Sequence, residues 1–397
     1  MSGRRFMEAM GEVGDNYIEE ALQYVPAKSM VRGTWMKWCV TAACLALIVC
    51  AGIFATRSGK ETPFELDPSL PMLRIESGEG GMGYSAVMYY DISEDSDLNP
   101  WNEEVVLETL PVYENLAYVE DTGGLSIYLS EEEMKALAED VAARLGEKIT
   151  ETELERLKDC TDAPEGFTGE EACSYTVYTQ NTGINVEGNG QIRVNFLQEV
   201  ALPEGFEETE DNVMKLAEEY TNLVQLQKPV VDVYGDYTFS GEQYKDSVAY
   251  DCDEDMLQSI LNYNFEPVKF NLSLDGKALS SIVMQNAMAS SKKLGDYPAI
   301  TVKEARKALL AGEYVTNVWE EDLPEGGIHK EDIAKVELVY YVRNTCQTYL
   351  PYYCFYILQP EREGVTMAEG LNSYGLVYVP AIRREYLENY PGEITFN

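Results

Sequence analysis

Two aromatic runs near the carboxyl end decide how we expect the chain to fold: KVELVYYV at residues 335–342 and YLPYYCFY at residues 349–356. Tyrosine, phenylalanine and β-branched residues favour strands, and only six residues separate the two runs. We therefore predict strands over 334–343 and 352–358, as the two arms of one hairpin.

The tyrosines of these runs are too many to belong to one core. Exposed tyrosine concentrates at recognition surfaces, so one hypothesis is a face that binds a protein or peptide partner. The alternative is an ordinary sheet whose outer face is covered by tyrosine. The candidate partner-binding tyrosines are Tyr340, Tyr349, Tyr352 and Tyr353.

Upstream of these strands, a pattern of one helix followed by strands occurs three times. The first and third helices open with capping boxes, Ser130 with Glu133 and Thr301 with Glu304. The pattern predicts an α+β fold in which antiparallel sheets are each packed by one helix. The predicted units are 83–200, 201–298 and 299–397.

A membrane segment separates these units from the amino terminus. Residues 38–56, WCVTAACLALIVCAGIFAT, are 19 uncharged residues. As a helix they would extend about 28 Å, close to the hydrocarbon thickness of a bilayer. We predict a single transmembrane helix here, a tail over 1–37 and a proline- and glycine-rich linker over 57–82. A buried core helix and a cleaved signal peptide are the alternatives.

Charge is divided unequally across this segment. The tail carries five basic residues before the segment, whereas residues 61–397 hold 64 acidic and 23 basic residues. The positive-inside rule places the tail in the cytoplasm and the acidic part outside the membrane of a bacterial cell. Such an acidic chain repels phosphate backbones, so binding of nucleic acid is disfavoured.

The tail has apolar residues three or four apart, as in an amphipathic helix. A stretch this short cannot bury the stripe by itself, so the stripe needs a partner protein or the membrane surface. A weakly helical tail that only anchors the chain is the alternative. The candidate contact residues are Phe6, Met10, Val13, Tyr17 and Ala21.

The sequence contains no convincing motif for catalysis, cofactor binding or metal binding. The chain has a single histidine, His329, which removes most Ser-His-Asp, Cys-His and multi-histidine metal mechanisms. Gly78-x-Gly80-x-x-Gly83 precedes a predicted strand and not a helix, unlike a dinucleotide-binding loop. The acidic run beginning at Asp251 lacks the glycine and glutamate of a calcium loop. We therefore expect no catalytic residue, cofactor or metal site, and no enzyme activity.

Five cysteines follow the membrane segment, so they cannot all pair. Cys160 with Cys173 and Cys346 with Cys354 are the plausible bridges. Free thiols throughout are the alternative, and the sequence leaves both open.

Several segments resemble Gram-positive, clostridial single-pass membrane proteins of unknown function. FMEAMGEV at 6–13 is similar to the tail of anti-sigma-factor-like proteins, and the stretches Asp91–Trp101 and Leu110–Tyr113 are similar to ectodomains of the same group. The C-terminal unit, with TVKEARKALLAGEY, VELVYYV, LPYYCFYIL and YGLVYVPAI, resembles PepSY and YycI/YycH-like regulatory ectodomains.

The resemblance implies a helix packed on antiparallel strands, and control of a membrane sensor or sigma pathway without catalysis. We therefore expect a membrane-anchored regulator whose ectodomain senses or binds a partner and whose tail contacts a sigma factor or sensor kinase. An extracellular module that binds peptide or cell-wall material is the alternative.

Overall fold

The computed structural model describes part of the chain: residues 65–75, 85–120, 124–160, 169–273, 275–361 and 366–391. The described residues from Leu66 onward belong to one compact unit. Among them, no helix is both long enough and apolar enough to cross a bilayer. The predicted tail and the predicted membrane segment, 38–56, lie outside the described residues.

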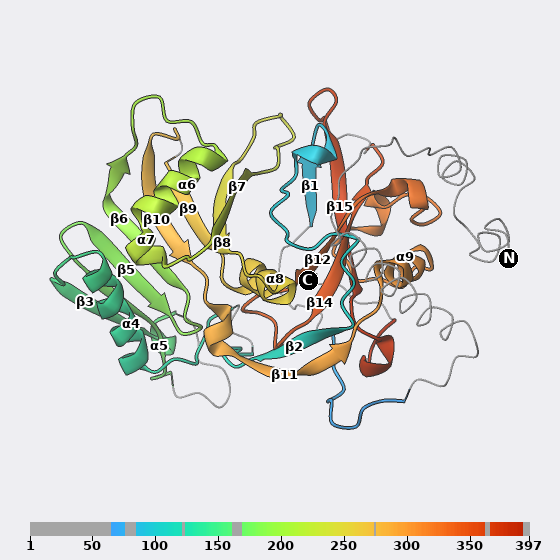
Figure 1. Cartoon of the computed structure of the whole chain (residues 1–397), viewed down its shortest axis with the longest axis horizontal. Coiled ribbons are helices and arrows are strands. Elements are labelled where there is room, and N and C mark those ends of the chain that lie inside the picture. Colours follow the sequence, from blue (N-terminus) through green and yellow to red (C-terminus); the bar gives the residue numbers. More distant parts are fainter. Residues whose placement is uncertain are drawn as a thin grey trace, which may run out of the picture. The chain divides into compact units, whose positions relative to one another are not determined.

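Most of the described chain is antiparallel sheet, and the largest sheet has eight strands (Figure 1). Its central pairing joins β6 to β10, which are far apart in the sequence. In sheet order the strands are β3 (Glu151–Arg156), β4 (Ala172–Tyr178), β5 (Thr182–Glu187), β6 (Ile192–Ala201), β10 (Ala278–Met284), β9 (Val268–Leu272), β8 (Asp246–Asp251) and β7 (Pro229–Tyr234).

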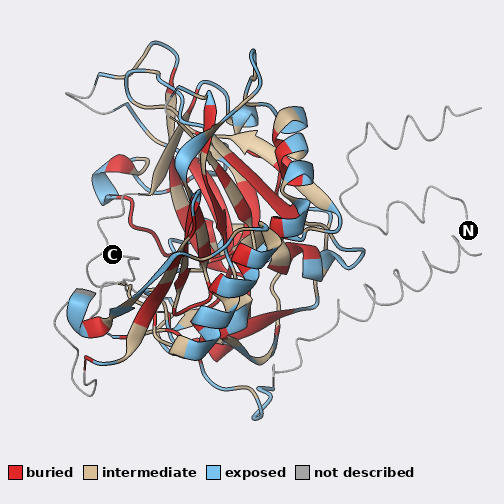
Figure 2. Cartoon of the chain, turned by 90° about the vertical axis from the view of Figure 1, so that its left-hand side faces the viewer, coloured by how far each residue is buried: buried red, intermediate tan, exposed pale blue. Residues whose placement is uncertain are grey.

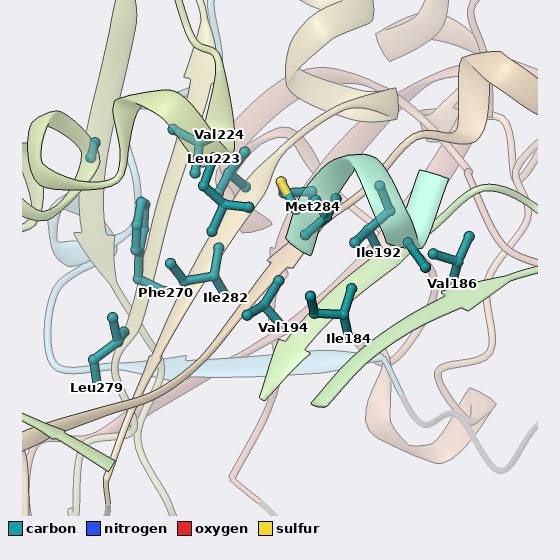
Figure 3. Close-up of a cluster of buried hydrophobic side chains, with 14 of the residues drawn as sticks. Ile184, Val186, Ile192, Val194, Leu223, Val224, Phe270, Leu279, Ile282 and Met284 are labelled. Carbon is teal, nitrogen blue, oxygen red and sulfur yellow. The ribbon is translucent and has the colours of Figure 1, made fainter. Parts of the chain in front are cut away.

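Helices cover one face of this sheet. Helix α4 (Glu131–Arg144) packs on β4 and β5, while α6 (Glu210–Glu219) packs on β7 and β8 and the short α7 (Thr221–Val224) contacts both helices. Their apolar residues meet the inward side chains of the strands in one continuous core, seen in Figure 3, whose members include Ile184, Val194 and Ile282. A further short helix, α5 (Leu157–Cys160), follows β3.

Two smaller sheets complete the fold. The four-stranded sheet has the order β1 (Ala86–Tyr89), β15 (Asn372–Pro380), β14 (Pro351–Leu358) and β12 (Ile333–Tyr340). The three-stranded sheet has the order β11 (Ser291–Pro298), β2 (Thr109–Asn115) and β13 (Thr348–Tyr349). Helix α9 (Val302–Leu310) packs against β15. The short 3-10 helices are η1 (Ile92–Glu94), η2 (Ala287–Ser290), η3 (Glu320–Asp322), η4 (Lys330–Asp332) and η5 (Arg384–Tyr386).

Helix α8 (Met256–Phe265) connects the large sheet to the two small ones, since it contacts both β8 and β12. Its last residue, Phe265, is fully buried. The Phe265 ring lies 5.3 Å from Tyr113, 5.2 Å from Tyr340 and 5.5 Å from Tyr349, each as an edge contact. Aromatic pairs in this geometry add stabilisation beyond the area they bury. Figure 2 shows the resulting continuous buried interior.

The predicted fold class, an α+β protein with one helix on each antiparallel sheet, is wrong for the described residues. The described residues form fifteen strands in three sheets with few helices. Helices α4, α6 and α7 share one sheet, which contains strands from two of the predicted units. The repeated order of elements along the chain reflects local preferences, whereas the β6–β10 pairing closes a connection of more than seventy residues.

Residues that start helices were identified more accurately from the sequence than the arrangement of the helices and sheets. Both predicted capping boxes are present, at the start of α4 and at the start of α9. The acidic run after β8 has a helix-starting role, because Asp255 accepts a hydrogen bond from the N–H of Leu257 at 3.0 Å and caps α8. Helix α8 was not predicted.

Replacing Phe265 by alanine should lower the free energy of unfolding by about 3–5 kcal/mol, because a fully buried ring leaves a cavity among three tyrosines. Phe239→Ala is the matched control, since Phe239 is 53% exposed. Urea unfolding of the full chain in detergent measures both. Equal losses for the two variants would show that Phe265 is not a core residue.

Candidate functional site

The predicted partner-binding tyrosines are buried. Tyr340, Tyr349, Tyr352 and Tyr353 expose 5%, 1%, 2% and 5% of their surface. They therefore do not form an exposed face in the folded chain. The predicted tail contacts, Phe6, Met10, Val13, Tyr17 and Ala21, lie outside the described residues.

The hydroxyl groups of two of these tyrosines, Tyr340 and Tyr353, donate hydrogen bonds inside the fold. Tyr340 donates a hydrogen bond to the carbonyl of Pro111 at 2.9 Å. Tyr353 donates to the carbonyl of Ile300, also at 2.9 Å, and its ring lies 5.4 Å from Trp101. A tyrosine can be buried when its hydroxyl is satisfied in this way. Both faces of β14 are covered, so its tyrosines fill two layers of core.

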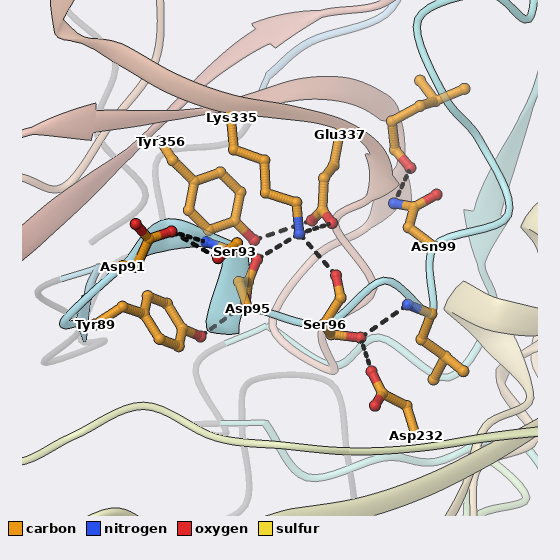
Figure 4. A network of polar contacts seen from close by, with 12 residues as sticks. Tyr89, Asp91, Ser93, Asp95, Ser96, Asn99, Asp232, Lys335, Glu337 and Tyr356 are labelled. Atoms are coloured by element: carbon orange, nitrogen blue, oxygen red, sulfur yellow. Dashed lines mark hydrogen bonds and ion pairs between the residues drawn. The ribbon is translucent and has the colours of Figure 1, made fainter. Parts of the chain in front are cut away.

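The most concentrated polar cluster surrounds Lys335 on β12 (Figure 4). Its ammonium lies 2.6 Å from the carboxylate of Asp95 and 2.9 Å from that of Glu337. It also donates to the carbonyl of Ser96 at 2.7 Å. The side chains of Asp95 and Glu337 are less than one tenth exposed. One cation is therefore shared by two buried carboxylates.

Tyrosine and serine hydroxyl groups complete this Lys335 cluster. Tyr356 donates to Glu337 at 2.9 Å, and Tyr89 donates to Asp95 at 2.7 Å. The Ser96 hydroxyl donates to Asp232 at the edge of the large sheet. The cluster thus joins β12, the segment around η1 and β7. These elements come from both the four-stranded and the eight-stranded sheet.

The charge balance of the cluster shifts two pKa values. Burial raises the pKa of Glu337, and the lysine only partly offsets this because Asp95 adds a second negative charge. Burial acts to lower the pKa of Lys335, but the two carboxylates outweigh it and the pKa is raised. The lysine therefore stays charged, while the raised pKa of Glu337 makes this carboxylate easier to protonate than an ordinary glutamate.

The Lys335 cluster has a structural role. The sequence pattern gave only a weak indication of it. Its charges are satisfied by one another, and none of its residues lines the groove described below. Lys335 and Glu337 alternate in an otherwise apolar strand, so both side chains lie on one face. Two opposite charges on a face that must be buried predict an internal ion pair. The residues predicted to be functional on this strand and its neighbours were tyrosines, not Lys335 and Glu337.

Glu337→Gln should change how stability depends on pH. The raised pKa means that the folded state binds the proton more tightly than the unfolded state, whose glutamate has the ordinary value of about 4.5. Wild-type stability from this group is therefore greatest at low pH and falls as the pH rises through the folded pKa. Glutamine does not titrate, so the free energy of unfolding of the variant should rise relative to that of wild type as the pH increases above 4.5.

Urea unfolding at a series of pH values measures this difference. Glu331→Gln is the matched control, because it removes the same charge from an exposed position just before β12. A stability difference between wild type and Glu337→Gln that stays constant with pH, as in the control, would contradict the assigned direction.

The structure tests one of the two proposed disulfide bridges. Cys354 is a buried free thiol, so the proposed bridge from Cys346 to Cys354 is not formed. Burial raises the pKa of the Cys354 thiol well above its usual range, which keeps it protonated and unreactive. The side chain of Cys160 is not described, so the other proposed pair stays open.

Residues 67–75 lie within the predicted linker 57–82, but buried Leu73 and Ile75 and several hydrogen bonds attach them to the fold. Leu73 forms a parallel bridge to Leu387, and its N–H donates to the carbonyl of Tyr386 at 2.8 Å. The N–H of Ile75 donates to Asn389 Oδ1 at 3.0 Å, and Asn389 Nδ2 donates back to the Ile75 carbonyl at 2.7 Å. We call these contacts between 67–75 and 386–389 the clamp.

Two tyrosines extend the clamp toward the three-stranded sheet. The Tyr386 hydroxyl accepts a hydrogen bond from the N–H of Asp67 at 3.1 Å. The Tyr297 hydroxyl donates to the carbonyl of Pro71 at 2.9 Å, and the two rings meet edge-on at 5.2 Å. Tyr297 and Tyr386 are both fully buried, so the first described segment is fixed to the carboxyl-terminal end of the fold.

A groove of about 340 Å³ lies beside the clamp, between α9 and the end of β15. Lys307, Ala308 and Ala311 line it from the helix side, and Ile382 and Arg383 line it from the opposite side. The remaining charged lining residues are Glu304, Glu313, Arg384 and Glu385. Small residues on the helix keep the groove open, and its rim carries both signs of charge.

The chain matches no protein-family model, no curated protein and no solved structure with which it was compared. Its function therefore has to be inferred from its own residues.

Proposed function

We propose that the protein is a non-enzymatic regulator anchored in a bacterial membrane. Residues 38–56 form the single membrane span, the tail lies in the cytoplasm, and the folded part lies outside the cell. The length and apolar character of 38–56, the basic tail and the acidic outer part support this arrangement. The segments that resemble anti-sigma-factor-like tails and PepSY or YycI/YycH-like ectodomains support a role in signalling.

The clamp is the observation that carries this proposal. A protein that is merely tethered to a membrane needs only a flexible linker before its folded part. Here the chain is fixed to the fold from Asp67 onward by backbone hydrogen bonds at Leu73 and Ile75. A change at the carboxyl-terminal end of the fold therefore acts directly on the segment that leads to the predicted span.

The inner partner in this proposal is a sigma factor or a sensor kinase that binds the tail stripe. Phe6, Met10, Val13, Tyr17 and Ala21 would bury against it. Protein partners favour such a stripe because burying its apolar area is the main source of affinity.

A second candidate function is an extracellular module that binds peptide or cell-wall material. The groove between α9 and β15 is the observation that favours it, since the tyrosines first considered for this role are buried. In this case the tail and span serve only as an anchor.

An arginine at position 47, in the centre of 38–56, should prevent stable insertion into the membrane. A charged side chain there costs about 2.5–3.5 kcal/mol on insertion scales. Leu47→Arg is compared with Ser58→Arg, which adds the same charge just outside the segment. The measurement is the fraction of full-length chain left in membranes after an alkaline wash. Retention of both variants equal to wild type would exclude 38–56 as the span.

Charges placed in the tail stripe should abolish capture of the inner partner. Phe6→Asp with Tyr17→Asp buries two unpaired carboxylates in the contact, each at a cost of several kcal/mol. The control is Gly11→Asp with Asn16→Asp, which adds the same charge off the stripe. Full-length variants are purified from gently solubilised membranes, and captured proteins are identified by mass spectrometry.

A sigma factor or kinase held by wild type and control but lost from the double variant is the expected outcome. If the same regulator is captured by all three chains, the stripe is not the contact. If none of the three captures a cytoplasmic protein, the second candidate function is favoured.

A further inference from the structure

We infer that the groove between α9 and β15 is a binding site for the carboxyl-terminal end of a short extended peptide whose last side chain is small and aliphatic. Every lining residue belongs to the described fold after Leu66. The inference therefore goes beyond the proposed regulatory function and does not depend on membrane anchoring.

The first support is the placement of positive charge. Residues 61–397 carry 64 acidic but only 23 basic residues, yet three basic side chains line this one groove. Lys307 stands on the α9 wall, while Arg383 and Arg384 stand on the opposite wall. An anionic group between the walls would be contacted from both sides.

The second support is that Lys307, one of these three cations, is available to bind a ligand carboxylate. Arg384 lies 3.2 Å from the carboxylate of Glu313, and Arg383 lies 3.9 Å from that of Glu385. Lys307 makes no ion pair with any carboxylate of the described residues, and it is exposed. A ligand carboxylate can therefore bind Lys307 without breaking an existing contact. Arg383 lines the same groove.

The third support is the balance of charge in the groove. Three cations stand against Glu304, Glu313 and Glu385. This neutral balance suits one carboxylate with a single charge better than a phosphate with close to two, since the second charge would face the glutamates.

The fourth support is the apolar part of the lining. Ala308, Val379 and Ile382 line the groove next to the charged residues. A cavity of about 340 Å³ lies at the lower end of the ~300–1,000 Å³ typical of small ligand sites. It has room for a short piece of peptide with a small aliphatic side chain. Capture of a terminal carboxylate is a known mode of peptide recognition.

The test uses full-length protein in detergent and the probe acetyl-Ala-Val with a free carboxylate. Its affinity is measured by calorimetry or by ligand-observed NMR, and compared with that of acetyl-Ala-Val amide. The amide should bind roughly tenfold more weakly, because it loses charge-assisted hydrogen bonds from both walls.

Variants locate the binding. Lys307→Gln and Arg383→Gln, one from each wall, should each weaken binding of the free acid by roughly fivefold to tenfold. Lys330→Gln is the matched control, because it removes the same charge from an exposed position outside the groove. The control should stay within about twofold of wild type, as screened long-range charge predicts. All three substitutions are at surface positions, and their unfolding temperatures check the fold.

Three results would overturn the inference. Equal binding of the acid and the amide would show that no carboxylate is recognised. Equal loss in Lys307→Gln and Lys330→Gln would show only general attraction to charge. Displacement of the probe by inorganic phosphate at equal concentration would show a general oxyanion site and not a peptide site. Because the tail variants are not used, failure here leaves the proposed inner partner untouched.

Discussion

The arrangement of the sheets depends most on the two ion pairs that Lys335 makes with Asp95 and Glu337. Strand β12 is an edge strand, and edge strands expose backbone groups that invite unwanted pairing. The segment 91–101 covers this edge, held by Lys335 and by Asn99, which donates to the Leu338 carbonyl at 3.1 Å. At the same edge, Asn264 of α8 accepts a hydrogen bond from the N–H of Tyr340 at 2.8 Å. A buried charge cluster is a poor source of net stability but fixes one arrangement of its neighbours.

Aromatic packing around Phe265 supplies the apolar part of the same connection. Helix α8 stands between β8 and β12, so its final residue meets tyrosines from β2, β12 and β13. The polar cluster therefore joins the four-stranded sheet to the eight-stranded sheet, whereas the aromatic cluster joins the four-stranded sheet to the three-stranded sheet through α8. Together they turn three sheets into one compact unit.

The carboxyl-terminal segment brings the two functional features together. Arg383 and Arg384 line the groove, and Tyr386 to Asn389 form one side of the clamp. A ligand held at the groove would contact residues directly adjacent to those that fix Leu73 and Ile75. This adjacency is compatible with either function considered: a regulator that passes a binding event toward the membrane, or a module whose site lies close to its anchor.

Helix starts, buried helix faces and strands could be predicted from neighbouring residues in the sequence. Ser130 and Thr301 start helices because their side chains satisfy free N–H groups, and the apolar spacing of α4 and α6 marked their buried faces. The tyrosine-rich runs at 335–342 and 349–356 were correctly expected to pair as strands. Periodicity could not show that both faces of β14 are covered, since burial of the second face depends on elements far away in the chain.

The sequence by itself determined the charge asymmetry, the apolar segment at 38–56, and the helices and strands that follow from capping and alternation. Only the tertiary structure decided that β6 pairs with β10, that Lys335 meets Asp95, and that Lys307 and Arg383 line one groove. These contacts join residues from about 70 to 240 positions apart. Their formation depends on the total packing of the chain and not on the preferences of neighbouring residues, which are all that a sequence pattern records.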